Sequence, residues 1–253
     1  MQIFKGLKQF TVSGINQLSF KASIDKVLFD FSKREPSIHE NIECISYHIP
    51  KTAGTSLRLS LDHAYHANSV HGAYKESGAK ELSRGDNIWL PNKTKVIHGH
   101  FRTHVNHYQY FPNAKHIVWV RDPIERAWSL LGHLLAVKPN TPHFNLLKSR
   151  YIDKGILNKA KLFQCVVKDV ELSNQFFVYH SYFKQISIDK FNFVGSMHNM
   201  NNDFTRLSDV LGKTLIVENQ NRRTSAKDLP TEAKRLEKFF ANEYEIVASY
   251  LNK

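Results

Sequence analysis

Alternating apolar residues predict the first strand of the chain. In ECISYHI, residues 43–49, apolar side chains occupy every second position, which is the period of a strand. The loop PKTAGTS that follows combines proline and glycine with small hydroxyl residues, a composition typical of turns. Leu57, Leu61 and Ala64 then recur at the spacing of one helix face. These residues predict a strand, a loop and a helix in succession.

A second unit of the same kind follows further along. The apolar run HIVWV at residues 116–120 predicts a strand that leads into RDPIERAWSLLGHLLAV. Asp122 is placed to cap a helix, Pro123 suits its first position, and Glu125 completes a capping box. The predicted helix has an apolar stripe formed by Ile124, Trp128, Leu131 and Leu135.

The remaining segments also alternate between strand and helix patterns. KVIHGH at 95–100 predicts a short buried strand with a polar end, and residues 191–194 predict another. Residues 66–94 predict a long surface excursion, whereas residues 140–190 are mostly helical in pattern. The last predicted element is an amphipathic helix with an apolar face of Leu236, Phe240, Tyr244, Val247 and Leu251. This order predicts an α/β fold with a mostly parallel central sheet flanked by helices.

Charge and cysteine usage narrow the class of protein. Lys and Arg number 35 against 23 Asp and Glu, which gives a formal net charge of +12. Such a surface attracts anions: a nucleotide, an acidic polysaccharide, nucleic acid or an acidic membrane. Cys44 and Cys165 form no disulfide framework or zinc-type spacing, which indicates a reducing compartment. No apolar run approaches the roughly 20 residues that cross a bilayer, so we expect a soluble, non-secreted protein.

The PKTAGTS loop is a candidate anion site. A loop of small residues before a helix directs backbone N–H groups to one point, and the helix N-terminus adds partial positive charge. Lys51 supplies a full charge, and Thr52, Thr55 and Ser56 supply hydroxyl groups. The loop is not a Walker A motif, because GxxxxGKS/T places its lysine at the end of the loop. The alternative is a simple tight turn with an exposed lysine.

Two motifs together resemble a known family. HIPKTAGTS at 48–56 and VWVRDPIERAWS at 118–129 are similar to sulfotransferases that use 3′-phosphoadenosine-5′-phosphosulfate. The likeness is closest to the carbohydrate group typified by heparan sulfate and uronosyl 2-O-sulfotransferases, and it implies a P-loop-like sulfotransferase fold that needs no metal. In that family the first motif binds the 5′-phosphosulfate and the second binds the 3′-phosphate. Carried over, the first set is Lys51, Thr52, Ala53, Gly54, Thr55 and Ser56, and the second is Arg121 and Ser129.

Spacing tests the second of these sets. If Asp122 caps the helix, Ser129 lies about seven residues in, roughly 10 Å along the axis. Convergence on one phosphate therefore requires the Arg121 side chain to fold back along the helix, or the helix to begin later. The alternative for Arg121 is a salt bridge at a helix start.

His98 and His100 stand at the end of a predicted strand, where alternation sends both imidazoles to one side of the sheet. The resemblance extends to this HGH, which includes the catalytic base in the 2-O-sulfotransferases. An imidazole of ordinary pKa about 6.5 suits that role, and we expect His100 first and His98 second. A zinc site with His104 and His107 is the rival hypothesis; we interpret those two residues as solvated loop residues.

Two later segments resemble the family only in outline. In FNFVGSMHNM, residues 191–200, His198 stands where an acidic residue is usual in the family. A basic segment sits where related enzymes place a loop over the nucleotide, and a solvated charge run is the alternative. The residues of that segment are Asn221, Arg222, Arg223, Thr224 and Ser225.

The sequence therefore predicts an enzyme that moves a sulfuryl group to a carbohydrate hydroxyl. His100 takes the proton of the acceptor, and Lys51 stabilises the departing oxygen. The expected partner is a carbohydrate, which can itself be polyanionic, with no nucleic acid, no membrane insertion and no metal. Two alternatives are a kinase with an unusual phosphate loop, in which Asp122 holds the metal, and a non-enzymatic polyanion-binding module.

A length of 253 residues suits a single domain. We expect one sulfotransferase domain over 1–253, with an N-terminal extension at 1–40, a cofactor-binding core at 41–137, and a helical part with the C-terminal helix at 138–253. Animal enzymes of the resembled group carry a membrane anchor and act in the Golgi. Here we expect a cytoplasmic bacterial enzyme, with a trimmed lumenal domain as the alternative.

Overall fold

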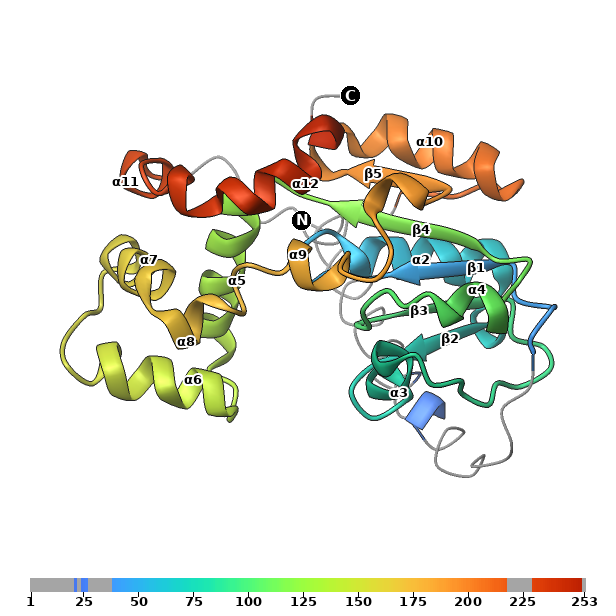
Figure 1. Ribbon diagram of the computed structural model, residues 1–253, viewed down its shortest axis with the longest axis horizontal. Coiled ribbons are helices and arrows are strands. Elements are labelled where there is room, and N and C mark those ends of the chain that lie inside the picture. Colours follow the sequence, from blue (N-terminus) through green and yellow to red (C-terminus); the bar gives the residue numbers. More distant parts are fainter. Residues whose placement is uncertain (1–20, 22–23, 27–37, 218–228, 252–253) are drawn as a thin grey trace, which may run out of the picture.

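The computed structural model describes residues 21, 24–26, 38–217 and 229–251. Its centre is a five-stranded sheet in the order β2-β3-β1-β4-β5, and all four strand pairs are parallel. Figure 1 shows helices flanking this sheet, so the α/β prediction is confirmed. The strands are β1 (Cys44–Tyr47), β2 (Val70–Ala73), β3 (Val96–Gly99), β4 (Lys115–Val120) and β5 (Phe193–Ser196).

The helices fall into those that cover the sheet and a separate group beside α5. Figure 1 shows α6, α7 and α8 in that group, which confirms the helical pattern expected for residues 140–190. The α-helices are α2 (Gly54–Tyr65), α3 (Ala79–Arg84), α4 (Asn106–Tyr110), α5 (Pro123–Val137), α6 (Pro142–Leu147), α7 (Lys159–Lys168), α8 (Val170–Ser173), α9 (Tyr179–Tyr182), α10 (Met200–Leu211), α11 (Thr231–Lys234) and α12 (Ala241–Leu251). Shorter turns are η1 (Ala67–Ser69), η2 (Lys148–Ile152), η3 (Ile188–Lys190), η4 (Met197–Asn199) and η6 (Glu237–Phe240).

The surface excursion expected at residues 66–94 is wrong in part. Strand β2 and helix α3 lie inside it, and Val70, Ala73 and Leu82 are fully buried. The strand VHGA is too short and too polar to show a strand period. Tertiary contacts hold it instead: the Gly72 N–H donates to the Asp25 carboxylate at 2.9 Å while β3 pairs on the other side.

Strand β1 differs from its predicted pattern as well. Alternation predicts one polar face, yet Cys44 and Ser46 are as fully buried as Ile45. The strand is central, with β3 and β4 on its two sides, and a central parallel strand is covered on both faces. The Ser46 hydroxyl is hydrogen-bonded to His98 Nδ1 at 2.9 Å, which satisfies a polar group in that position.

The terminal amphipathic helix is interrupted. It consists of α11, η6 and α12, although the predicted face is kept: Leu236, Phe240, Val247 and Leu251 are buried and Tyr244 is partly buried. The face packs on the helical group at one end and on the sheet at the other. Within the part of the chain that the structure describes, no helix is both long and apolar enough to span a membrane.

The connections of the sheet mark where a ligand site belongs. From β1 the chain passes toward the β2 edge, whereas from β4 it passes to β5 at the other edge. Neighbouring parallel strands whose connections leave in opposite directions form a crevice at their carboxyl ends, and open α/β sheets bind ligands there. The loops after β1 and β4 carry Lys51 and Arg121, so the two motifs meet at this crevice.

Candidate active site

The loop between β1 and α2 has an unusual backbone. Lys51 and Ala53 have φ values of 74° and 68°, a left-handed conformation that residues other than glycine rarely adopt. Such turns direct successive N–H groups toward one point and form a concave anion site. Helix α2 begins at Gly54 without a side-chain cap, so its first N–H groups and its dipole act at the same place. The loop therefore has the geometry of a phosphate or sulfate site.

The hydroxyl groups of this loop do not all face the site. The Thr52 side chain is buried, and its hydroxyl donates to the Ile49 carbonyl at 2.8 Å, so it closes the loop. In this structure the hydroxyl proton goes to that carbonyl, and a role of Thr52 in binding an anion stays a prediction. Ser56 is also buried, whereas Thr55 is half-buried. Lys51 and the backbone N–H groups remain the main donors of the loop.

Three imidazole rings lie together beside the loop. His98 on β3 is fully buried, and His100 follows the strand with an exposed side chain. Both rings lie on the same side of the sheet, because each contacts His48, with ring centroids 5.1 Å and 4.3 Å apart. Tyr74 lies edge-on to His100 at 5.0 Å. A Cβ on Gly54 would lie 1.8 Å from His48 Nε2, so this glycine makes room for the ring.

Packing of these rings against one another and against Tyr74 removes water from them and keeps the imidazoles neutral, although His100 is exposed as a residue. Desolvation lowers the pKa of His48 well below the ordinary value, and the neighbouring His100, His98 and Lys51 lower it further. Desolvation likewise lowers the pKa of His98 and, to a smaller extent, that of His100. Near pH 7 the three rings are therefore neutral. Of the pair that the sequence singled out, only His100 is exposed to a substrate.

The second motif folds largely as expected. Asp122 Oδ1 accepts a hydrogen bond from the Glu125 N–H at 3.0 Å, and Pro123 is the first residue of α5, so the predicted cap is confirmed. The expected capping box is wrong in its second half. The Glu125 carboxylate accepts from Arg121 Nε at 3.2 Å, because a guanidinium is a stronger partner for a carboxylate than a backbone N–H. His198 Nε2 lies 3.8 Å from the same carboxylate.

The direction of the Arg121 side chain bears on the spacing of the second set, whose role in binding a phosphate stays a prediction. Helix α5 begins at Pro123, so the helix does not start later than expected. The Arg121 side chain instead lies back along the helix and reaches Glu125 one turn in. Ser129 is four residues beyond Glu125, on the same face and about 6 Å further along the axis. Arg121 is also the salt bridge at a helix start that the sequence left open.

Residues of α9 and α12, which the sequence analysis missed, hold this turn. The Tyr179 hydroxyl donates to the Arg121 carbonyl at 2.6 Å and accepts from the Arg121 N–H at 2.9 Å. The buried Glu243 carboxylate accepts from three N–H groups around the start of α9, at 2.8, 3.0 and 3.2 Å. Tyr244 donates to Asp122 Oδ2 at 2.7 Å. A carboxylate on an apolar helix face was the available signal for Glu243.

Arg126 ties the two motifs together. Its side chain is fully buried, with Nη1 donating to the Pro50 carbonyl at 3.4 Å and Nη2 donating to the Phe176 carbonyl. Its guanidinium also lies over the Tyr179 ring, 5.9 Å from the centroid. One side chain of α5 therefore fixes the loop after β1 and the end of the helical group. Nothing in the spacing of the motif marks this residue.

The rival zinc hypothesis finds no support in the histidines around α4. His107 is fully buried, with Nδ1 hydrogen-bonded to the Tyr47 hydroxyl at 2.9 Å and Nε2 to the Leu82 carbonyl at 3.0 Å. Its interpretation as a solvated residue is wrong, because α4 packs it beneath β1. His104 is half-buried. Among the described residues, no group of three or more His, Cys, Asp or Glu side chains is arranged to hold a metal.

The basic segment remains a prediction. Asn221, Arg222, Arg223, Thr224 and Ser225 lie outside the described residues.

Comparison with known proteins bears on the fold. No protein-family model matches the chain, and no curated protein matches it. Among solved structures, mouse sulfotransferase SULT7A1 complexed with PAP aligns with a TM-score of 0.51 and 14% identity, over 86% of this chain and 87% of that one. The chain has a sulfotransferase fold. A sulfotransferase from Alicyclobacillus acidocaldarius aligns over 83% of this chain and 96% of that one, with a TM-score of 0.43 and 14% identity.

Proposed function

We propose that this protein transfers a sulfuryl group from 3′-phosphoadenosine-5′-phosphosulfate to a hydroxyl group of a carbohydrate. The observation that carries the proposal is the pair of cationic turns at the β1/β4 crevice. Lys51 stands at positive φ in one turn, and the buried Arg121 begins the other. Two supports are the fold shared with a sulfotransferase complexed with PAP and the resemblance of the two motifs to the carbohydrate group.

Each of the two turns would bind one end of the donor. Lys51 and the N–H groups of residues 52–56 would hold the 5′-phosphosulfate, while Arg121 and Ser129 would hold the 3′-phosphate. The donor supplies an activated sulfuryl group, whose transfer resembles phosphoryl transfer in its spreading charge. Lys51 stabilises the negative charge that develops on the oxygen bridging to the departing nucleotide. The loop needs no reorganisation to do so, because its N–H groups are already oriented.

His100 would act on the acceptor. His100 is an exposed residue whose ring packs against His48 and Tyr74, and this packing desolvates the ring and lowers its pKa, so the imidazole is neutral. It takes the proton of the acceptor hydroxyl as the new oxygen–sulfur bond forms and the old one breaks. His48 packs against the His100 ring, with centroids 4.3 Å apart, and His98 packs against His48. The net charge of +12 favours an acidic carbohydrate as the acceptor.

The kinase alternative requires Asp122 as a metal ligand. Both of its carboxylate oxygens are occupied, Oδ1 by the Glu125 N–H and Oδ2 by the Tyr244 hydroxyl. A metal would have to share the carboxylate with the helix cap and the tyrosine contact that fix its orientation. The site therefore favours sulfuryl transfer over metal-dependent phosphoryl transfer.

Sulfur-labelled donor and a panel of sugars test the proposed function directly. We expect label on a carbohydrate hydroxyl without added Mg²⁺ or a nucleoside triphosphate. Transfer only from ATP with Mg²⁺ would support the kinase. Polyanion binding without transfer, retained when Lys51, His100 and Arg121 are all replaced by alanine, would support the binding module.

Replacing Arg121 by alanine should weaken binding of adenosine 3′,5′-bisphosphate by about 1.5–3 kcal/mol, the range for a charge-assisted hydrogen bond. AMP lacks the 3′-phosphate, so its affinity should hardly change. In the wild-type protein the bisphosphate should raise the melting temperature more than AMP or ATP does.

Glu125→Gln is the matched control for this arginine. It keeps Arg121 and removes the carboxylate that now pairs with it at 3.2 Å. We expect this variant to bind the bisphosphate at least as tightly as the wild type. Equal melting shifts with AMP and the bisphosphate would remove the case for a 3′-phosphate site.

Lys51→Ala should lower turnover by roughly 10²–10³, the usual cost of losing one donor that stabilises a developing oxyanion. Affinity for the spent nucleotide should fall less, because the lysine acts mainly in the transition state. Single-turnover rates and bisphosphate titrations measure the two effects. Lys138→Ala is the control, since Lys138 is exposed and also has a positive φ, 47°. Normal turnover with weaker donor binding would assign Lys51 to ground-state binding instead.

A further inference from the structure

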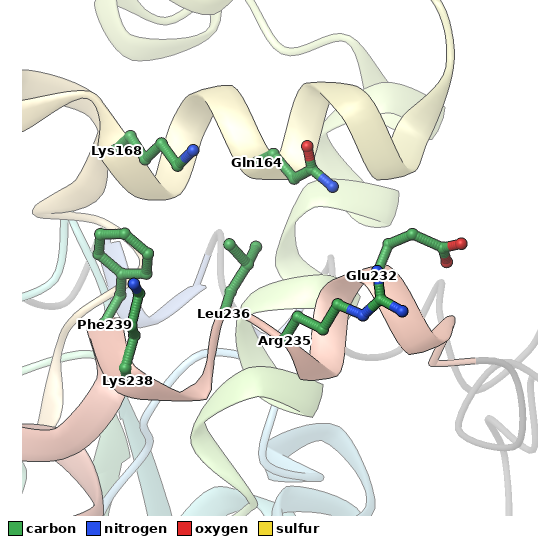
Figure 2. Close-up of a pocket in the computed structure, with 7 residues that line it drawn as sticks. All are labelled: Gln164, Lys168, Glu232, Arg235, Leu236, Lys238 and Phe239. Atoms are coloured by element: carbon green, nitrogen blue, oxygen red, sulfur yellow. The ribbon is translucent and has the colours of Figure 1, made fainter.

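A cavity lies between α7 and the α11–η6 segment, outside the candidate active site. Its volume is about 280 Å³. Figure 2 shows Gln164 and Lys168 on α7, with Leu236 and Phe239 pointing toward that helix from the opposite segment. The lining is completed by Glu232, Arg235 and Lys238. None of these residues belongs to the two motifs or to the histidine group.

The net positive charge of the side chains that line this cavity favours an anionic ligand. Lys168, Arg235 and Lys238 line it against the single carboxylate of Glu232. In the described part of the chain, neither Lys168 nor Arg235 forms an ion pair. Like charges that gather around one hollow repel each other unless an anion lies between them.

Two cations elsewhere in the same helical group form ion pairs with aspartates. Arg150 pairs with Asp169 at 2.8 Å, and Lys148 pairs with Asp153 at 2.7 Å. Carboxylates of this helical group therefore form ion pairs with cations that lie outside the cavity. The lining of the cavity keeps its excess positive charge.

The apolar and neutral groups of the cavity identify the rest of the ligand. Leu236 is buried in its floor, and Phe239 is one of the few large apolar side chains left exposed, at 39%. An exposed aromatic face packs well against the C–H groups of a sugar ring. The Gln164 amide and the Glu232 carboxylate can bond hydroxyl groups. A bare sulfate or phosphate would gain nothing from Phe239 and would be repelled by Glu232.

The volume of the cavity limits how large a ligand it can hold. A volume of about 280 Å³ lies just below the roughly 300–1,000 Å³ found for pockets that hold drug-sized ligands. This space suits one sugar ring and not a chain of several. We propose that the α7–η6 cavity binds a single anionic sugar residue, carrying a carboxylate, sulfate or phosphate group. This proposal does not depend on sulfuryl transfer, because the cavity and the candidate active site share no residue.

An amide NMR titration of the full chain tests the site. The probes are N-acetylglucosamine 6-sulfate, glucuronate, glucose and sodium sulfate, all at constant ionic strength. We expect saturable shifts in residues 162–168 and 232–240 with the two acidic sugars, and none with glucose at the same concentration. Shifts confined to other parts of the chain would overturn the proposal.

Variants distinguish binding in this cavity from non-specific attraction of an anion to the basic surface. The double variant Lys168→Ala with Arg235→Ala should lower the affinity for N-acetylglucosamine 6-sulfate at least tenfold. The matched control is Lys80→Ala with Lys93→Ala, which removes the same charge from exposed lysines elsewhere and should change affinity less than twofold. Equal weakening in the two double variants would overturn the proposal. All four side chains are exposed, and melting temperatures check that each variant is folded.

Two further variants test the sugar and the location. Phe239→Ala should lower the affinity for both acidic sugars at least threefold and leave the affinity for sulfate unchanged. Sulfate binding as tight as that of the sugars, with no effect of Phe239→Ala, would show a bare anion site and overturn the proposal. Lys51→Ala with Arg121→Ala should leave sugar binding intact. Its loss in that variant would place the sugar in the active site instead.

Discussion

Replacing His100 by alanine is expected to lower turnover by roughly 10²–10⁴, the usual contribution of general acid–base catalysis. His100 is exposed beside the β1–α2 loop, whereas His98 is fully buried and hydrogen-bonded to Ser46. Donor binding should persist, because Lys51 and Arg121 belong to other elements. Steady-state turnover and bisphosphate affinity, measured on the same preparation, separate the two effects.

The pH profile identifies the base. Desolvation lowers the pKa of His100 to about 4. The acid limb of the rate should therefore lie below the pH of 6 to 7 that an unperturbed histidine gives. As the pH falls through the lowered pKa, the imidazole becomes protonated and can no longer accept the acceptor's proton. This limb should vanish in His100→Ala.

Two controls accompany the His100 variant. His98→Asn keeps a side chain that can bond the Ser46 hydroxyl, and it should retain the acid limb of the wild type. Loss of the limb in His98→Asn alone would transfer the role to His98. Activity should also persist in EDTA, because a histidine base needs no zinc. Most of the activity remaining in both His100→Ala and His98→Asn would remove both histidines from consideration.

Lowering the pH from 7 to 5 is expected to remove several kcal/mol of unfolding free energy. Burial lowers the pKa of five buried histidines: His39, His71, His98, His107 and His116. In the unfolded chain these imidazoles bind protons as the pH falls through about 6.5. In the folded protein they stay neutral until the pH reaches their lowered values. The unfolded state then binds more protons, so stability falls with pH.

The size of this effect follows from linkage. Each such histidine removes up to about 1.4 kcal/mol per pH unit below its unfolded pKa. Small domains have a total stability of only about 5–15 kcal/mol, so a few histidines suffice to unfold the protein in mild acid. Urea unfolding at pH 7, 6 and 5 measures the loss. A free energy of unfolding that stays constant over this range would contradict the prediction.

His116→Phe tests a single member of the set. The Tyr47 hydroxyl lies between His107 Nδ1 at 2.9 Å and His116 Nδ1 at 3.0 Å. The His116 ring also stacks on Tyr108 with centroids 4.3 Å apart, and phenylalanine keeps that stacking. The free energy of unfolding of this variant should depend less steeply on pH, by an amount that corresponds to at most one bound proton. His180→Gln, which replaces an exposed histidine, is the control variant.

The sequence by itself determined the two units that carry the motifs. The strand, loop and helix around PKTAGTS, and the Asp122 cap and Pro123 start of α5, follow from local preferences. Periodicity, turn residues and caps act within a few positions, so they are visible in the order of residues. The parallel sheet followed from the alternation of such units.

Only the tertiary structure decided which residues hold the site in place. His48 joins His98 and His100 because β1 and β3 pair in parallel register. Arg126 reaches Pro50 across 76 positions, and Glu243 binds the N–H of Val178 across 65. Contacts between such distant segments leave no period in the sequence. The edge strand β2 was missed for the same physical reason, since pairing with β3 and the carboxylate of Asp25 hold a segment whose own composition is that of a loop.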